Sequence, residues 1–212
     1  MKLSAVLSLT ILFVFNQIAS NAQAINNTGA CTIGCPSNMI IKAETGKEGA
    51  SVTFPLATSF GDCGTISYSP ASGSFFRLGS HSIIATSSSG QKCSFTITVT
   101  DNQPPSLSPI TLSRDKLWPV SNKLKKVGVY YNTSDNAQDV KTEISVSSNA
   151  TDGNKDWEIV DDHLVRLIAS RLPDGSPRIY IITVTATDES GNRTTRTTSI
   201  AVSNTMTAIA AR

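Results

Sequence analysis

The chain is 212 residues long and carries 18 Lys and Arg side chains against 16 Asp and Glu, so it is close to neutral. A chain of this kind lacks the positive excess through which proteins recognise nucleic acids and acidic membrane surfaces, and we exclude both as main partners. Only 16% of the residues are charged and 6% are aromatic, while Ser, Thr, Val and Ile are abundant. This composition is typical of β-strand proteins.

The first 24 residues have the pattern of a secretory signal peptide. Lys2 precedes an apolar run from Leu3 to Phe15, and Ala22-Gln23-Ala24 supplies the small residues of a cleavage site. The apolar run is shorter than the roughly 20 residues that a membrane-spanning helix needs. We therefore expect residues 1–24 to be removed and the mature protein, without a transmembrane segment, to be secreted to the extracellular surface or to a bacterial periplasm.

Strands dominate the remaining sequence, because apolar and hydroxyl residues alternate along it. The run CSFTITVT is the clearest example, and the proline pair that follows it ends one module and begins another. The later runs KKVGVYY, TEISVSS, LVRLIAS, IYIITVTAT and TTSIAVS are separated by turn sequences such as LPDGSP and DESGN. We predict an all-β protein with two immunoglobulin-like β-sandwich domains in tandem. Its expected parts are a signal peptide at 1–24, a lead-in at 25–33, sandwiches at 34–103 and 104–203, and a tail at 204–212.

All four cysteines, Cys31, Cys35, Cys63 and Cys93, lie in the lead-in and the first predicted sandwich, and none lies in the second. In a secreted chain, such a set is normally paired. In an immunoglobulin-like sandwich the first strand lies beside the last and parallel to it, which brings Cys35 near Cys93. We predict the disulfides Cys35–Cys93 and Cys31–Cys63, since a bridge from Cys31 to Cys35 would close a tight loop that constrains little.

The order of these motifs resembles a known module. CPSNMIIKAETG is followed by FGDCG and then by SPASGSFFRLGSHSIIATSSSGQKCSFTITVTDNQPP, which together are similar to the hyalin repeat, or HYR domain, over residues 34–105. The chain departs from that pattern at residues 87–91, where SSSGQ replaces an acidic D-x-x-G-N loop. The resemblance implies an immunoglobulin-like fold and adhesion or protein interaction without catalysis. It also implies a bond between the cysteines that match the first and last of the family, Cys35 and Cys93.

The second half also resembles a known module. LWPVSNKLKKVGVYY, ISVSSNATDGNKDWEI and LVRLIASRLPDGSPRIYIITVTATDESGN, within residues 105–203, are similar to a module of secreted bacterial proteins that often accompanies HYR domains. The resemblance implies a bacterial, extracellular, accessory role and no activity of its own. This half contains no cysteine, so its core must hold it together, and we place Trp157 at the centre of that core.

Acidic residues gather in the turns of the second module. Calcium takes about six to eight oxygen ligands, so Asp135, Asp139, Asp152 and Asp188 are candidate calcium ligands. The same sequences also suit hairpin turns, in which Asp188 caps backbone amides and Gly191 takes a positive φ. No loop has the regular ligand spacing of an EF-hand, so we expect plain turns and no cofactor, with calcium as the alternative.

Few residues could support catalysis or small-ligand binding. The two histidines, His81 and His163, lie in different modules without sequence neighbours that would complete a zinc site, and the motifs of a nucleophilic hydrolase are missing. Tyr130 and Tyr131 are candidate ligand-binding residues, because neighbours on a strand face opposite sides and one ring is left outside. We predict a secreted, non-enzymatic adhesion or protein-interaction protein whose partner is an extracellular protein or glycan. The alternatives are a carbohydrate-binding accessory module and, third, a hydrolytic enzyme.

Overall fold

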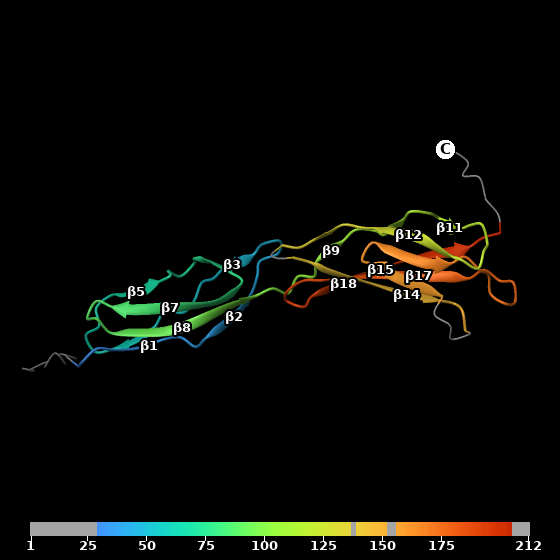
Figure 1. Ribbon diagram of the computed structural model, residues 1–212. Coiled ribbons are helices and arrows are strands. Elements are labelled where there is room, and N and C mark those ends of the chain that lie inside the picture. The colour runs from blue at the N-terminus through green and yellow to red at the C-terminus, as the bar shows by residue number, and fades with distance from the viewer. Residues whose placement is uncertain (1–28, 137–138, 152–155, 205–212) are drawn as a thin grey trace, which may run out of the picture.

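The computed structural model describes residues 29–136, 139–151 and 156–204, and in these residues all regular structure is β. Figure 1 shows two sandwiches lying end to end, with β1 to β8 in one and β9 to β18 in the other. The predicted fold class, two immunoglobulin-like β-sandwiches in tandem, is therefore correct. The predicted signal peptide, residues 1–24, lies outside the described residues. Within the described residues, no helix has the length and apolar character to cross a membrane.

The first sandwich is built on one four-stranded sheet, in the order β2-β8-β7-β5, together with two short antiparallel pairs, β1-β4 and β3-β6. β2 pairs with β8 in parallel, as predicted for the first and last strands of the sandwich. Apolar side chains that alternate along β8 face inward onto Phe54, Phe76 and Ile83. The strands are β1 (Thr32–Gly34), β2 (Met39–Lys42), β3 (Gly49–Ser51), β4 (Thr58–Phe60), β5 (Ile66–Ser69), β6 (Phe75–Arg77), β7 (Gly79–Ser87) and β8 (Lys92–Thr100).

Two disulfides close this first sandwich. Cys31 is bonded to Cys63 with 4.8 Å between their Cα atoms, and Cys35 is bonded to Cys93 with 5.7 Å between theirs. These are the two pairs that the sequence predicts. The second bond ties the segment before β2 to the start of β8, so it reinforces the parallel pairing of these two strands.

The second sandwich packs two four-stranded sheets, β10-β12-β16-β15 and β11-β18-β17-β14, and a short pair, β9-β13. β11 runs parallel to β18, which repeats the arrangement of β2 and β8 in the first sandwich. The strands are β9 (Ser106–Leu107), β10 (Thr111–Leu112), β11 (Lys116–Leu117), β12 (Leu124–Tyr130), β13 (Thr133–Ser134), β14 (Lys141–Ser148), β15 (Trp157–Asp161), β16 (Leu164–Ile168), β17 (Ile179–Thr187) and β18 (Arg193–Val202).

The centre of the second core is Tyr180, and the prediction that Trp157 would fill it is wrong. Trp157 is only partly buried, because β15 is the outermost strand of its sheet and its side chains lie at the rim. Tyr180 lies on β17, between two neighbouring strands, and is fully buried. Its hydroxyl donates to the backbone oxygens of Ile168 and Asp156, at 2.9 and 3.3 Å, so the buried phenol has hydrogen-bond partners within the core.

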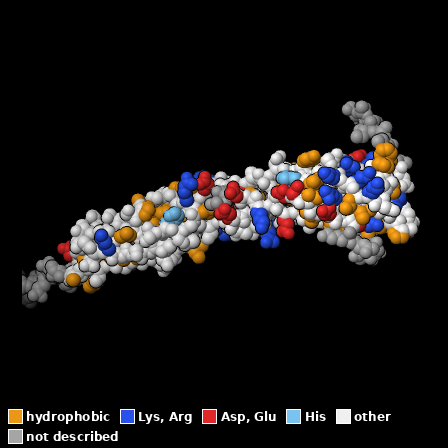
Figure 2. Space-filling view, in the orientation of Figure 1, with side chains coloured by type: hydrophobic (Ala, Val, Ile, Leu, Met, Phe, Trp, Pro, Cys, Tyr) orange, Lys and Arg blue, Asp and Glu red, His pale blue; other side chains and the backbone are white. Residues whose placement is uncertain are grey.

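Charged side chains are unevenly distributed over the two sandwiches. On the face shown in Figure 2 they gather over the second sandwich and over the junction between the two, while the first sandwich is mostly uncharged. The outward residues of β8, Ser94, Thr96, Thr98 and Thr100, are uncharged. At the junction, Asp101 after β8 lies close to Asp135 and Asp188 of the second sandwich.

Candidate functional site

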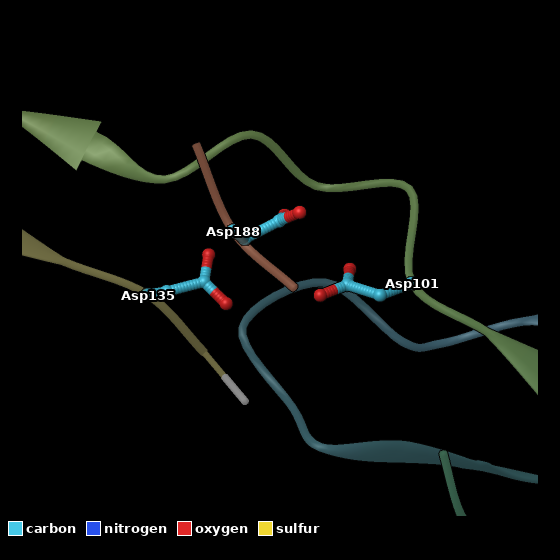
Figure 3. A group of neighbouring side chains, drawn as sticks. All are labelled: Asp101, Asp135 and Asp188. Atoms are coloured by element: carbon cyan, nitrogen blue, oxygen red, sulfur yellow. The ribbon is translucent and has the colours of Figure 1, made fainter. Parts of the chain in front are cut away.

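The junction is formed by the linker after β8, the segment after β13 and the hairpin turn between β17 and β18 (Figure 3). The hairpin turn is DESGN, in which Gly191 has a φ of 87°, a value that favours glycine. The Asp188 carboxylate accepts hydrogen bonds from the backbone and side-chain nitrogens of Asn192, both at 2.8 Å. Asp188 thus has the capping role that the sequence predicts for this turn.

The linker is fixed to the first sandwich by Gln103. The side-chain oxygen of Gln103 accepts from the backbone nitrogen of Gly46 at 2.6 Å, and its side-chain nitrogen donates to the Glu44 carbonyl oxygen at 3.2 Å. The backbone nitrogen of Gln103 in turn donates to the Asp101 carboxylate at 2.9 Å. The first residues of the linker are therefore held against the loop between β2 and β3.

The linker is fixed to the second sandwich as well. Thr194 donates through its hydroxyl to the Pro105 carbonyl oxygen at 2.6 Å, and the Asn192 side chain reaches the Asp101 carbonyl oxygen at 3.5 Å. One further hydrogen bond crosses the junction directly, from the Asn136 side chain to the Lys47 carbonyl oxygen at 2.9 Å. The two sandwiches are thus connected by several bonds besides the covalent chain.

Three carboxylates converge at this junction. One oxygen from each of Asp101, Asp135 and Asp188 lies within 4.8 Å of the others, and Asp188 is only 6% exposed (Figure 3). Carboxylate oxygens are the ligands that calcium prefers, and three carboxylates could provide half or more of the about six to eight oxygens that it takes. The capping bonds of Asp188 and Asp101 also account for the positions of these two side chains without an ion.

The predicted calcium candidates separate into different groups in the structure. Asp135 and Asp188 belong to the cluster, while Asp139 is exposed and is not part of it. Asp152 lies outside the described residues. Asp101, the third member, is not among the predicted candidates, because it lies in the linker after β8 and not in a turn of the second module. The signal that could have found it is its position, since an acidic residue at the end of one sandwich must face the turns at the near end of the next.

A second candidate site lies where β12 ends. A hollow of about 380 Å³ is lined by Tyr130, Tyr131, His163 and neighbouring residues of the β9–β10 segment. Tyr130 is 56% exposed, whereas Tyr131 packs partly against the core, so the two rings lie on opposite faces as predicted. Tyr131 stacks on His163 with 4.7 Å between ring centroids and donates through its hydroxyl to the Asp162 carbonyl oxygen at 2.6 Å. Burial raises the pKa of Tyr131 above its ordinary value.

The two histidines have ordinary structural roles in their sandwiches. His81 packs on Phe76, and its Nε2 lies 2.8 Å from the Arg77 carbonyl oxygen. The Nδ1 of His163 lies 3.0 Å from the Val129 carbonyl oxygen. Among the described residues, the acidic cluster at the junction is the group of potential metal ligands, and neither histidine is part of it.

The fold and its junction define a tandem immunoglobulin-like β-sandwich protein with two disulfides in its first sandwich. That first sandwich matches the HYR domain family over residues 27–99. No curated protein matches the sequence.

Several solved structures of cadherin domains are similar to the chain at low identity. Domains 1–4 of protocadherin gamma B7 share 13% identity at a TM-score of 0.37, covering 82% of this chain and 50% of that one. Domains 1–2 of human mucin-like protocadherin share 11% at a TM-score of 0.34, covering 81% and 96%. Domains 1–3 of Drosophila N-cadherin share 14% at a TM-score of 0.31, covering 84% and 68%. The chain thus spans half the length of the protocadherin gamma B7 structure.

Proposed function

We propose that the chain is a secreted, non-enzymatic adhesion or protein-interaction protein, in which two sandwiches form a stiff spacer that presents their surfaces to an extracellular partner. The observation that carries this proposal is the junction, because Gln103 fixes the linker to the first sandwich and Thr194 fixes it to the second. A proline pair between these two contacts restricts the backbone further. The match of the first sandwich to the HYR domain supports an interaction role.

Three further assignments belong to this proposal. Residues 1–24 are the cleaved signal peptide, which agrees with the disulfides, since such bonds persist in oxidising compartments. The domain boundary lies between residues 103 and 104. The second sandwich is an accessory module of the kind found in secreted bacterial proteins, as its sequence suggests.

Binding of the mature protein to its surroundings tests the interaction role. We expect beads coated with residues 25–212 to bind saturably to cell-envelope or matrix material from the source organism, and protease treatment of that material to abolish the binding. If binding resisted protease and disappeared after glycosidase treatment, the partner would be a glycan and the protein-interaction part of the proposal would be wrong. Turnover of a polysaccharide or an ester by the purified protein would replace it with an enzyme.

The stiffness of the spacer has its own test. Gln103→Ala combined with Asn136→Ala removes side-chain bonds that involve the linker or cross the junction. We expect small-angle X-ray scattering to show a wider spread of interdomain orientations for this variant than for the wild type. Gln91→Ala, at the exposed β7–β8 turn, is the matched control. Equal scattering from all three proteins would show that these bonds do not fix the junction.

A further inference from the structure

We propose that the hollow at the end of β12 binds a neutral glycan, with the exposed ring face of Tyr130 as the stacking surface. The ligand class and the site go beyond the adhesion role and do not rest on it, because a glycan site would serve a spacer or an accessory module equally. The hollow, of about 380 Å³, is at the lower end of the range of about 300 to 1,000 Å³ that small-ligand pockets occupy. It therefore suits one sugar ring of a longer chain.

The ring of Tyr130 lies along the outer surface of its strand. Gly128 and Tyr130 are two residues apart on β12, so they share the outward face, while Val127 and Val129 point into the core. A Cβ on Gly128 would meet the Tyr130 hydroxyl oxygen at 2.8 Å and ring carbon Cζ at 3.0 Å. The ring thus covers the glycine, and any larger residue at 128 would displace it.

A ring placed over the strand in this way leaves its other face open, which agrees with the 56% exposure of Tyr130. The face of an aromatic ring carries negative charge density. The C–H bonds on the apolar face of a pyranose are weakly positive and match it. Tyr130 is therefore available for stacking on a sugar ring.

Asn132 supplies hydrogen-bonding groups at the edge of the same hollow. Its backbone is fixed by two bonds with Ser108: its nitrogen donates to the Ser108 hydroxyl, and its carbonyl oxygen accepts from the Ser108 nitrogen, both at 2.9 Å. The Asn132 side-chain amide forms no hydrogen bond within the described part of the chain. A fixed backbone with a free amide offers one acceptor and two donors to neighbouring sugar hydroxyls.

His163 provides a second fixed polar group. The Val129 carbonyl oxygen can only accept, so the Nδ1 of His163, 3.0 Å away, carries the proton. In the neutral ring, Nε2 is then an acceptor. Stacking on Tyr131 holds the ring, and the backbone oxygen of His163 accepts from the Val129 nitrogen at 2.8 Å. Groups fixed in advance lose little entropy when a ligand binds.

The charges around the hollow favour a neutral ligand. No lysine or arginine lines it among the described residues. Two acidic residues lie next to it: Asp161 accepts from the His163 backbone nitrogen at 2.8 Å, and Asp162 accepts from the Thr142 hydroxyl at 3.4 Å. A sulfated, phosphorylated or uronic acid sugar would meet negative charge without a cation to offset it. We therefore expect neutral hexose or pentose chains to bind and acidic ones to be rejected.

Titration with purified polysaccharides tests this inference. The mature protein, produced in a bacterium so that the N-x-S sequence at Asn132 is unmodified, is run in affinity gels containing laminarin, xylan, galactomannan or dextran, with alginate and heparin as acidic probes. We expect at least one neutral polysaccharide to retard the protein. Binding of none of the four, or of the acidic probes alone, would overturn the proposal. Because no protein partner is present, this result is independent of the bead experiment.

Variants separate a binding role from a structural role of Tyr130. Tyr130→Ala should weaken binding about tenfold through loss of an aromatic contact, while Tyr130→Phe should keep it. Phe75→Ala removes a similarly exposed ring from the first sandwich and serves as the control. Melting curves of each variant show whether the fold survives. If Tyr130→Ala, still folded, bound like the wild type, the ring would only cover Gly128.

Discussion

Reduction of the disulfides should destabilise the first sandwich and leave the second unchanged. The Cys35–Cys93 bond joins positions 58 residues apart, and the Cys31–Cys63 bond joins positions 32 residues apart. On the chain-entropy estimate, loops of these sizes each contribute about 4 kcal/mol. A small domain is stable by only about 5 to 15 kcal/mol, so the loss of either bond removes a large share. The second sandwich contains no cysteine and is an internal control.

Differential scanning calorimetry of the mature protein, with and without reductant, measures this effect. We expect the transition of the first sandwich to fall by roughly 15 to 30 °C when Cys35→Ala and Cys93→Ala are combined, since 1 kcal/mol shifts the melting temperature of a domain this small by about 4 to 8 °C. The transition of the second sandwich should not move. A joint shift of both transitions would show that the sandwiches unfold as one unit. A shift below about 5 °C, corresponding to less than about 1 kcal/mol, would show that the chain-entropy estimate fails for this fold.

The remaining predictions concern the junction and the second core. Asp101→Asn keeps an acceptor for Gln103 and removes one of three converging charges, so in chelator it should raise the melting temperature, whereas the exposed Asp139→Asn should not. If the cluster holds calcium, millimolar calcium will raise the melting temperature of the wild type and of the Asp139 variant but not of the Asp101 variant. If the melting curves of the wild type with calcium and with chelator coincide, the carboxylates only cap the backbone. Tyr180→Phe should cost about 1 to 3 kcal/mol in urea unfolding, because the buried Ile168 carbonyl oxygen loses the hydroxyl as a donor, while the Asp156 carbonyl oxygen keeps its bond from the Ile168 nitrogen; no loss would contradict the hydrogen bonds assigned to the hydroxyl. Burial raises the pKa of Tyr180 from 10.0 to about 12, so the unfolded chain ionises first and stability should fall as the pH rises from 10 towards 12; Tyr180→Phe should lack this part of the fall.

Local patterns in the sequence correctly predict the strands with clear alternation and the parallel pairing of the first and last strands of the first sandwich. Alternation in CSFTITVT gives β8 with its inward and outward faces, and the hairpin turn DESGN forms where turn chemistry places it. The pairing of Cys35 with Cys93 follows from the parallel neighbours β2 and β8. Each of these features depends on residues close in sequence, or on a strand order shared by most sandwiches of this type.

Features that depend on the placement of whole elements could not be predicted in the same way. The burial of Trp157 depends on whether its strand is central or outermost, and alternation is the same in both cases. The meeting of Asp101 with Asp188 depends on the angle between two sandwiches, which hydrogen bonds such as Asn136 to Lys47 help to fix. The Tyr130 ring can lie over its strand because residue 128, two positions earlier, is a glycine. The sequence alone does not show that the ring covers this glycine.

Different interactions stabilise the two sandwiches. The first uses covalent bonds, while the second has a buried polar network around the ion pair between Arg178 and Asp156, whose side chains are 7% and 5% exposed. Arg178 also donates to the Ser170 carbonyl oxygen at 3.1 Å, and Ser148 donates to the Asp156 carboxylate at 3.4 Å, so both charges have additional partners. Removing one partner of such a pair costs about 3 to 5 kcal/mol, comparable to one disulfide of the first sandwich. A reducing environment therefore weakens only the first sandwich, and replacement of either charge of this pair weakens only the second.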